Sequence, residues 1–270
     1  MRAYYSPEDD ELYVLALEAH AQRLLRSSRL LKMQLGKSAR DIEAIILEVL
    51  RRSGFREDTY VRPVAYKASV VIKVGLTGLR DELAVYATPM GDYISTKGLS
   101  VQISGWRRTA DNAIPARSKL TGSYLNAALA VDDALQAGFD DAILLTDDGH
   151  VSEGSSSNLF LVRDGVASTP GVSHDILEGI TRSIVTRMLK DLGIPTVERA
   201  VDRTELYVAD EVFLCGTGVQ VAPVVEIDGR PVGTGTMGPV AAKLQKVYFD
   251  ACRARDPRYR DLVTPVYRGV

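Results

Sequence analysis

The segment with the clearest chemical potential runs from Pro115 to Asn126. Lys119 stands there between a polar loop and an alanine-rich apolar stretch, and small residues follow it where a helix is expected to begin. We expect this lysine to be partly buried, because burial favours the neutral amine that forms a Schiff base with a carbonyl group. Most lysines are solvated surface charges, so Lys119 alone does not establish this chemistry.

A carboxylate and a helix start follow this lysine along the chain. Glu153 stands in a predicted turn beside Gly154. Gly179 opens an amphipathic segment, so the backbone N–H groups of Ile180 and Thr181 should point at whatever lies before that helix. A phosphate is the group that such a helix start binds best. The alternative interpretation is a turn glutamate and an ordinary helix start.

Two further features predict anion binding. Gly216–Gly218 comes directly after a strongly apolar, strand-like run. Successive backbone N–H groups in a turn of this kind form a concave site for an anion. Arg23, on an early predicted helix, could hold the same anion with its guanidinium group. Singly these features are a tight turn and a solvated arginine, and only their combination with the lysine and the carboxylate indicates a cofactor site.

Composition narrows the class of protein. The 270 residues are 46% hydrophobic, which is enough for one large or two modest domains. A net charge of −2 gives no sign of nucleic-acid or membrane-surface binding, and no run of apolar residues is long enough to cross a membrane. Two cysteines and three scattered histidines predict no disulfide framework, no metal site and no Ser-His-Asp triad. The cytoplasm is the expected location.

Hydrophobic periodicity predicts a mixture of strands and helices. Ser38 is a plausible N-cap for the second helix, and Gly54 and Gly138 are expected to end the second and third helices. We expect strands at 11–17, 60–74, 83–87, 99–105, 142–146, 150–152, 158–163, 211–215 and 224–227. Helices are expected at 19–31, 38–52, 122–137, 180–192 and 240–251.

This order of elements predicts a mixed α+β protein with two domains. A polar, flexible stretch follows the third strand-like region and is the natural linker. We therefore expect a small domain at 1–95, a linker at 96–99 and a larger cofactor-binding domain at 100–270.

Taken together, these motifs resemble those of the fold-type IV pyridoxal-phosphate enzymes, and among them most closely the branched-chain amino acid aminotransferases. The resemblance covers the chain from Met1 to about Cys252. It implies a small α/β domain and a larger domain with a sheet-rich pseudo-barrel core. The motifs that carry it, in chain order, are Glu18–Leu24, Tyr60–Pro63, Lys119–Asn126, Ser152–Gly154, Asn158–Phe160, Gly179–Arg182 and Gly216–Thr217.

The resemblance implies a cofactor, pyridoxal 5′-phosphate, and a set of residues that bind it. Lys119 would hold the cofactor as an internal aldimine and then move the proton at the substrate α-carbon. Glu153 would face the pyridine nitrogen and keep the ring protonated, and Tyr124 would donate to the phenolic oxygen. The phosphate would be bound by Arg23, Ile180, Thr181, Gly216 and Thr217.

The same resemblance implies a substrate pocket. Arg62 matches the arginine with which this family binds the side-chain carboxylate of glutamate, and Tyr60 stands beside it. A solvent-facing strand arginine is the alternative. The remaining pocket positions are Met90, where several relatives have tryptophan, Tyr93, Gly218 and Val219.

The activity implied is transamination of leucine, isoleucine and valine with 2-oxoglutarate, which gives branched-chain 2-oxo acids and L-glutamate. The partners are these small molecules, and a homodimer or larger homo-oligomer is expected. Family members begin with a few tens of additional residues, so the small domain is expected to be shortened at its N-terminus. Either the sequence is truncated, or its start is misassigned, or the protein lacks these strands. In the last case we expect an intact cofactor site, an open substrate pocket and an exposed apolar sheet edge.

Four other functions remain open at this stage. Gly154–Asn158 is also similar to D-amino acid aminotransferases, and aminodeoxychorismate lyases share the fold. A relative that binds the cofactor without turnover is a third possibility. Gly233–Gly238 matches the dinucleotide fingerprint of NAD-dependent oxidoreductases, but too little chain follows it to complete a βαβ unit, so we expect a turn there.

Overall fold

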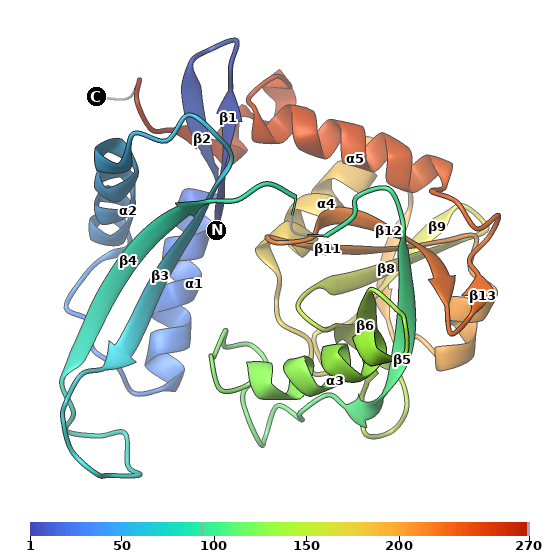
Figure 1. Cartoon of the computed structure of the whole chain (residues 1–270), viewed down its shortest axis with the longest axis horizontal. Coiled ribbons are helices and arrows are strands. Elements are labelled where there is room, and N and C mark those ends of the chain that lie inside the picture. Colours follow the sequence, from blue (N-terminus) through green and yellow to red (C-terminus); the bar gives the residue numbers. More distant parts are fainter. Residues whose placement is uncertain (93, 269–270) are drawn as a thin grey trace. The chain divides into compact units, whose positions relative to one another are not determined.

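The computed structural model describes residues 1–92 and 94–268 (Figure 1). The chain divides into two compact units: Met1–Gly91 with Phe249–Val270 forms unit 1, and Asp92–Tyr248 forms unit 2. From the sequence we predict a boundary near 96–99, with the whole C-terminal segment in the large domain. In the structure the C-terminal segment belongs to unit 1 instead.

Unit 1 is built on a five-stranded antiparallel sheet with the order β14-β2-β1-β3-β4. β1 therefore lies inside the sheet, and β14 and β4 are its edge strands. The strands are β1 (Arg2–Ser6), β2 (Glu11–Leu15), β3 (Thr59–Lys67), β4 (Asp81–Pro89) and β14 (Val263–Pro265). Two helices, α1 (Leu17–Leu30) and α2 (Ala39–Ser53), share one hydrophobic core with this sheet.

Helix α2 forms where local sequence signals agree. Ser38 caps its N-terminus: its hydroxyl accepts from the Asp41 N–H at 3.2 Å, and the Asp41 carboxylate accepts from the Ser38 N–H at 2.7 Å. Ile42, Ile46 and Leu50, spaced four residues apart, are fully buried. Gly54, with φ of 64°, ends the helix. The predicted helix, with its cap and its stop, is confirmed.

The C-terminal segment completes unit 1 through a buried carboxylate. Glu11 is fully buried, and its carboxylate accepts from three successive backbone N–H groups, of Val266 at 3.0 Å, Tyr267 at 2.8 Å and Arg268 at 2.6 Å. β14 pairs with β2 just before them. Periodicity could not reveal this pairing, because the two strands are separated by most of the chain.

The long strand expected at 60–74 is wrong in its second half. β3 ends at Lys67, and an irregular loop connects it to β4. In this loop Val70, Ile72 and Val74 are fully exposed, at 101%, 109% and 101% of their reference areas. A β-branched run favours a strand only when neighbouring strands and packing support it, and this run has neither among the described residues.

Unit 2 contains a mixed, curled sheet (Figure 1) with the strand order β10-β9-β8-β11-β12-β5-β6-β7, and β13 pairs with β12. The pairs β12–β5, β5–β6 and β9–β10 are parallel. The strands are β5 (Leu99–Arg107), β6 (Asp141–Leu145), β7 (Val151–Gly154), β8 (Asn158–Arg163), β9 (Val166–Pro170), β10 (Thr196–Arg199), β11 (Glu211–Gly216), β12 (Gln220–Ile227) and β13 (Arg230–Pro231).

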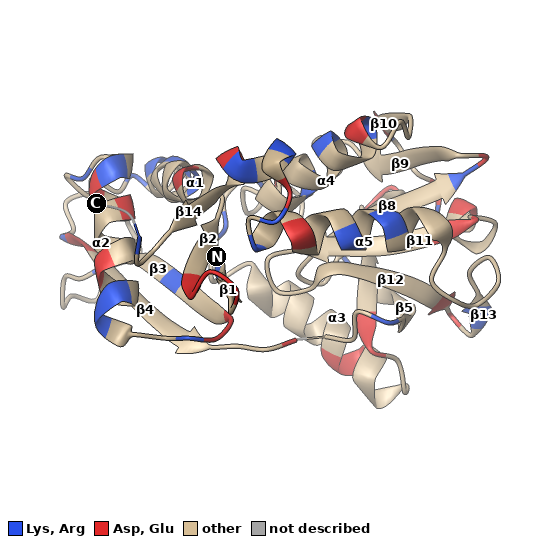
Figure 2. Ribbon diagram, turned by 90° about the horizontal axis from the view of Figure 1, so that it is seen from above, with Lys and Arg blue, Asp and Glu red and all other residues tan. Residues whose placement is uncertain are grey.

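Three helices accompany the sheet of unit 2: α3 (Tyr124–Gln136), α4 (Ile180–Asp191) and α5 (Pro239–Cys252), which runs across the boundary between the units. Short 3-10 helices occur at Arg203–Tyr207 and Pro257–Leu262. α3 packs through Ala130 and Ala134 against Ala142 and Leu144 of β6. Figure 2 shows both signs of charge along α2 and α5. None of the helices within residues 1–92 and 94–268 is long and apolar enough to cross a membrane.

The expected turn at Gly233–Gly238 is confirmed, and its chemistry excludes dinucleotide binding at α5. The Glu211 carboxylate accepts from the N–H groups of Val240 at 2.9 Å and Ala241 at 2.8 Å. A Cβ on Gly238 would lie 2.1 Å from the carboxyl carbon of Glu211, so only glycine allows this approach. The N–H groups that a pyrophosphate would need are already bound.

Candidate active site

Lys119 lies on a series of tight turns that leads into α3. The Ser118 N–H donates to the Pro115 carbonyl at 3.0 Å, and the Leu120 N–H donates to the Ser118 carbonyl at 2.9 Å. The lysine side chain is exposed, so the expected partial burial is wrong. It lies on a turn that precedes α3, which begins at Tyr124. Its Nζ lies 5.4 Å from the centre of the Tyr124 ring.

The lysine turn is attached to the segment that precedes α4. Arg117 bridges the carboxylates of Asp111 at 3.2 Å and Glu178 at 3.1 Å. The Asp111 N–H donates to Oδ1 of Asp175 at 2.9 Å. The ion pairs are nearly half exposed and each contributes little, but with the backbone hydrogen bond they fix the lysine turn beside the start of α4.

Glu153, on β7, is a buried carboxylate with three donors. Arg108, which directly follows β5, places Nη2 2.9 Å from Oε1. Oε2 accepts from Asn158 Nδ2 at 3.0 Å and from the Leu177 N–H at 3.1 Å. Burial raises the pKa of Glu153 to about 7, against the lowering effects of Arg108, of the Leu177 N–H and of the Lys119 charge. Such a perturbed group is typical of a functional site.

Two glycines allow this arrangement to form. A Cβ on Gly179 would lie 2.0 Å from Oδ1 of Asn158, and a Cβ on Gly154 would lie 2.4 Å from Oγ of Ser157. Asn158 is buried and also donates to the Leu177 carbonyl at 2.9 Å. The glycines are therefore needed for close approach, and the end of β7, the start of β8 and the start of α4 meet here.

The start of α4 has the predicted anion-binding character. Gly179 is its N-cap residue, and glycine has no side chain with which to cap the helix. Ile180 and Thr181 supply the first two N–H groups of the helix, which lack intrahelical acceptors. Thr181 is buried, and Ile180 is half-buried.

The second predicted anion site lies at the turn between β11 and β12. Gly216 pairs with Gln220 across this turn, and Thr217 and Gly218 lie between them and are half-buried. A Cβ on Gly216 would lie 3.5 Å from the Ser156 carbonyl oxygen, so the turn packs against the loop that joins β7 to β8. Val219 is buried, at 1% exposure. Unit 2 thus brings together its two predicted anion sites and the loop after Glu153.

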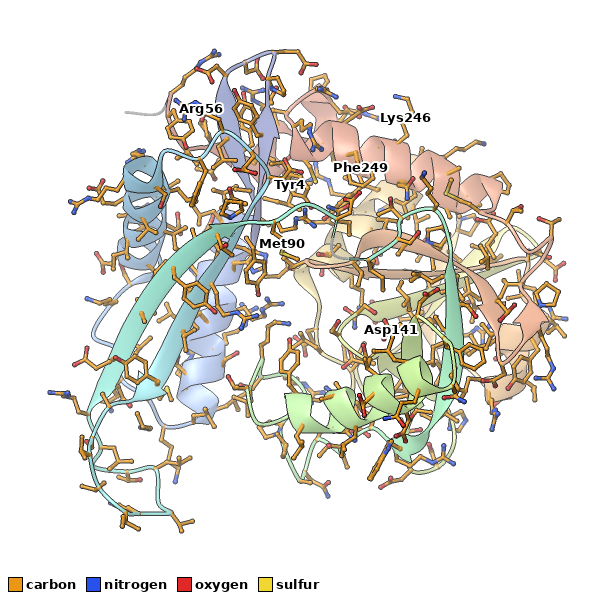
Figure 3. The ribbon with its side chains drawn as sticks, in the orientation of Figure 1. Tyr4, Arg56, Met90, Asp141, Lys246 and Phe249 are labelled. Atoms are coloured by element: carbon orange, nitrogen blue, oxygen red, sulfur yellow. The ribbon has the colours of Figure 1, made fainter. Side chains whose placement is uncertain are left out.

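Four of the predicted site residues belong to unit 1: Arg23, Tyr60, Arg62 and Met90. Arg23 is buried on α1, with Nη2 3.3 Å from Nδ1 of His20. Arg62 is exposed on β3, and its Nε and Nη2 donate to the Tyr60 hydroxyl at 3.2 and 3.1 Å. Met90 directly follows β4 and is half-buried (Figure 3). Tyr93 lies outside the described residues.

Arg108 and Arg117 are not among the site residues predicted from the sequence. Asn158 stands in one of the predicted motifs, but no role was predicted for it. Arginines are common on surfaces, and no local signal distinguishes these two. Asn158, five residues after Glu153 at the start of a strand, was the accessible clue, because asparagine is otherwise disfavoured in strands.

A phosphorylated pyridine aldehyde requires three kinds of group, and unit 2 has all of them: an amine on a turn, a buried carboxylate and a helix start whose first N–H groups lack intrahelical acceptors. The amine is suited to a carbonyl carbon, the carboxylate to a protonated ring nitrogen and the helix start to a phosphate. The residues of unit 2 therefore fit pyridoxal phosphate.

Comparisons with known proteins agree with this chemistry. The family model described as amino-transferase class IV matches residues 8–227. A protein of Aquifex aeolicus named probable branched-chain-amino-acid aminotransferase is 45% identical over 99% of this chain and 86% of its own length.

Solved structures give the same result. The branched-chain aminotransferase from Thermoproteus uzoniensis, solved with norvaline, is similar with a TM-score of 0.95 and 39% identity, over 98% of this chain and 88% of that chain. The branched-chain amino acid aminotransferase from Thermobaculum terrenum in its PLP form has a TM-score of 0.95 and 34% identity, over 100% of this chain and 88% of that chain. The family match spans most of the chain, and the chain belongs to the class IV aminotransferases, pyridoxal-phosphate enzymes of fold type IV.

Proposed function

We propose that this enzyme transfers the amino group of branched-chain L-amino acids to 2-oxoglutarate, with pyridoxal 5′-phosphate attached to Lys119. The products are branched-chain 2-oxo acids and L-glutamate. The observation that carries this proposal is the 45% identity to a protein named for branched-chain amino acids, which extends over nearly the whole chain. Similarity of structure to enzymes of the same name supports it.

Each proposed cofactor-binding residue matches one charged or polar group of the cofactor. Bound pyridoxal phosphate supplies a carbonyl carbon for amino groups and a ring that withdraws electrons from the substrate α-carbon. Glu153 accepts a hydrogen bond from the ring nitrogen and favours its protonated form. Ile180 and Thr181 donate backbone N–H groups to the phosphate. Arg23, Gly216 and Thr217 are further phosphate-binding positions in this proposal.

Lys119 and Tyr124 act nearer to the reacting atoms. The Lys119 amine would be the group that removes the proton from the substrate α-carbon and delivers one on the cofactor side. A lysine on an exposed turn has the freedom to move between these positions. The Tyr124 hydroxyl donates to the phenolic oxygen of the cofactor.

The substrate pocket must accept an apolar side chain in one half-reaction and a carboxylate in the other. We assign the glutamate carboxylate to Arg62, whose guanidinium is already oriented by the Tyr60 hydroxyl. Met90 and Tyr93 are proposed as pocket walls, and Gly218 and Val219 as neighbours of the substrate α-carboxylate.

D-amino acid transamination is the second candidate, favoured by the three serines at Ser155–Ser157. An assay with L-leucine and D-leucine, each with 2-oxoglutarate, separates the two. We expect glutamate from L-leucine only, and none from the Lys119→Ala variant. Glutamate from D-leucine but not from L-leucine would refute the proposal. Release of pyruvate from aminodeoxychorismate would instead identify a lyase.

We further infer a homo-oligomer, a dimer or larger, in the cytoplasm. The exposed apolar loop that contains Val70, Ile72 and Val74 supports association, because isolated side chains of this kind gain free energy when a second surface covers them. Both cysteines are buried free thiols, as expected for a reducing compartment. Replacing the three loop residues by serine should shift the native mass in light scattering to that of the monomer; an unchanged mass would remove this support.

A further inference from the structure

Within residues 1–92 and 94–268, the hydrogen bonds of Glu153 leave one acceptor position unused. An ionised carboxylate offers about four lone-pair positions, two on each oxygen. Oε2 receives two donors, Asn158 Nδ2 at 3.0 Å and the Leu177 N–H at 3.1 Å. Oε1 receives one, Arg108 Nη2 at 2.9 Å. The remaining position is therefore on the oxygen that Arg108 holds.

Arg108 is itself held at several points. Its backbone N–H donates to the Leu145 carbonyl at 2.8 Å, and its Nε donates to the Asp175 carbonyl at 3.2 Å. Its side chain is 10% exposed. The guanidinium plane is thus fixed between the carboxylate and the segment before α4, which a flexible ammonium group could not reproduce.

The carboxylate must also keep its negative charge in a buried place. Burial favours the protonated acid, and a protonated Glu153 would lose much of its attraction for a ring N–H group. Arg108 and Lys119 are the charged groups that act on it, and Arg108 has the larger effect. Arg108 is also the cation in direct contact with the carboxylate, with Nη2 2.9 Å from Oε1.

We propose that Arg108 is a positioning residue for the cofactor: it orients Glu153 so that the free acceptor position of Oε1 meets the pyridine nitrogen, and it keeps that carboxylate ionised. This inference rests on the proposed function. The pH at which Glu153 ionises separates this role from a purely structural one, because an arginine that only stabilises the fold would not change that pH.

The test uses Arg108→Gln and Arg108→Lys, with Arg199→Gln as the matched control. Arg199 also makes a partly buried ion pair in unit 2, with Glu205 at 2.6 Å, but that pair lies outside the candidate site. Glu153→Gln provides the reference in which this carboxylate is absent. The readout is the dissociation constant of pyridoxal phosphate for each apo-protein between pH 5.5 and 8.5, followed by absorbance.

At each pH, the ratio of the dissociation constant of Glu153→Gln to that of each other protein gives the contribution of the Glu153 charge to cofactor binding. In the wild type this contribution should grow as the pH rises through about 7. In Arg108→Gln the midpoint should rise by about one pH unit or more, and affinity at pH 7.5 should fall by about tenfold. Arg108→Lys, which keeps a charge but not the planar geometry, should keep the midpoint closer to wild type and still lose affinity. Arg199→Gln should leave both values unchanged.

An unchanged midpoint and affinity in Arg108→Gln, or an equal change in Arg199→Gln, would overturn the inference. If Arg108→Gln does not fold, Arg108→Lys decides: wild-type affinity in that variant would overturn the positioning role. Failure of the proposed function has another signature, since the wild type would then fail to bind pyridoxal phosphate or to transaminate L-leucine.

Discussion

Replacing Gly179 by alanine should destabilise unit 2 through a single steric conflict. The residue has φ of −69°, which alanine adopts without strain, so the backbone itself does not oppose the change. The new Cβ would lie 2.0 Å from Oδ1 of Asn158. Asn158 would have to move, and its hydrogen bonds to Glu153 and to the Leu177 carbonyl would lengthen or break.

The magnitude follows from those two bonds. Leaving a buried polar group without its partner costs about 1–3 kcal/mol, so loss of both bonds should cost about 3 kcal/mol. Alanine is also a poorer N-cap residue than glycine, by up to about 1 kcal/mol. In the Asn158→Ala background the conflict is absent, and Gly179→Ala should then cost only this last amount. The coupling between the two sites should therefore be about 3 kcal/mol.

Urea unfolding of the four apo-proteins of this double-mutant cycle provides the measurement. Trp106 is the only tryptophan in the sequence and lies on β5, so its fluorescence reports on unit 2. A cost below about 1 kcal/mol for Gly179→Ala in the wild-type background, or the same cost in both backgrounds, would refute the close packing of Gly179 against Asn158.

Three other changes have defined outcomes. In the folded protein the pKa of Glu153 is about 7, above its ordinary value of 4.5, so the stability that this group contributes is full below about pH 4.5 and is lost as the pH rises through 7. Thermal unfolding of the wild-type apo-protein, compared with Glu153→Gln, should show a loss of about 3 kcal/mol over that interval. Parallel pH profiles of the two proteins would contradict this. Glu11→Gln should weaken the anchoring of residues 266–268 by about 2 kcal/mol or more, visible as faster C-terminal trimming by carboxypeptidase, and equal trimming would exclude the anchor. Ser38→Ala removes the α2 cap and should lower stability by about 1 kcal/mol in urea unfolding, whereas no change would mean that the cap is energetically silent.

Features that depend on neighbouring residues could be predicted from the sequence. α2 was predictable because its cap, its apolar spacing and its terminal glycine all lie within seventeen consecutive residues, 38–54. The start of α4 was predictable for the same reason. By contrast, β9 and β10 were missed, because both are short and rich in small or polar residues. β9 forms a hairpin with β8, whereas β10 pairs with β9 from beyond α4.

Features that depend on tertiary contacts could not be predicted in this way. Arg108 gains its position from Glu153 and Asp175, which are 45 and 67 residues away in sequence. The pairing of β14 with β2 joins the two ends of the chain.

The most direct test of the central claim is the absorption spectrum of the purified enzyme before and after borohydride reduction, followed by peptide mapping. We predict a visible absorption band from the lysine-bound cofactor. Reduction should remove this band and leave the reduced pyridoxyl group on Lys119. A label on another lysine, or a colourless protein that stays colourless after pyridoxal phosphate is added, would contradict it.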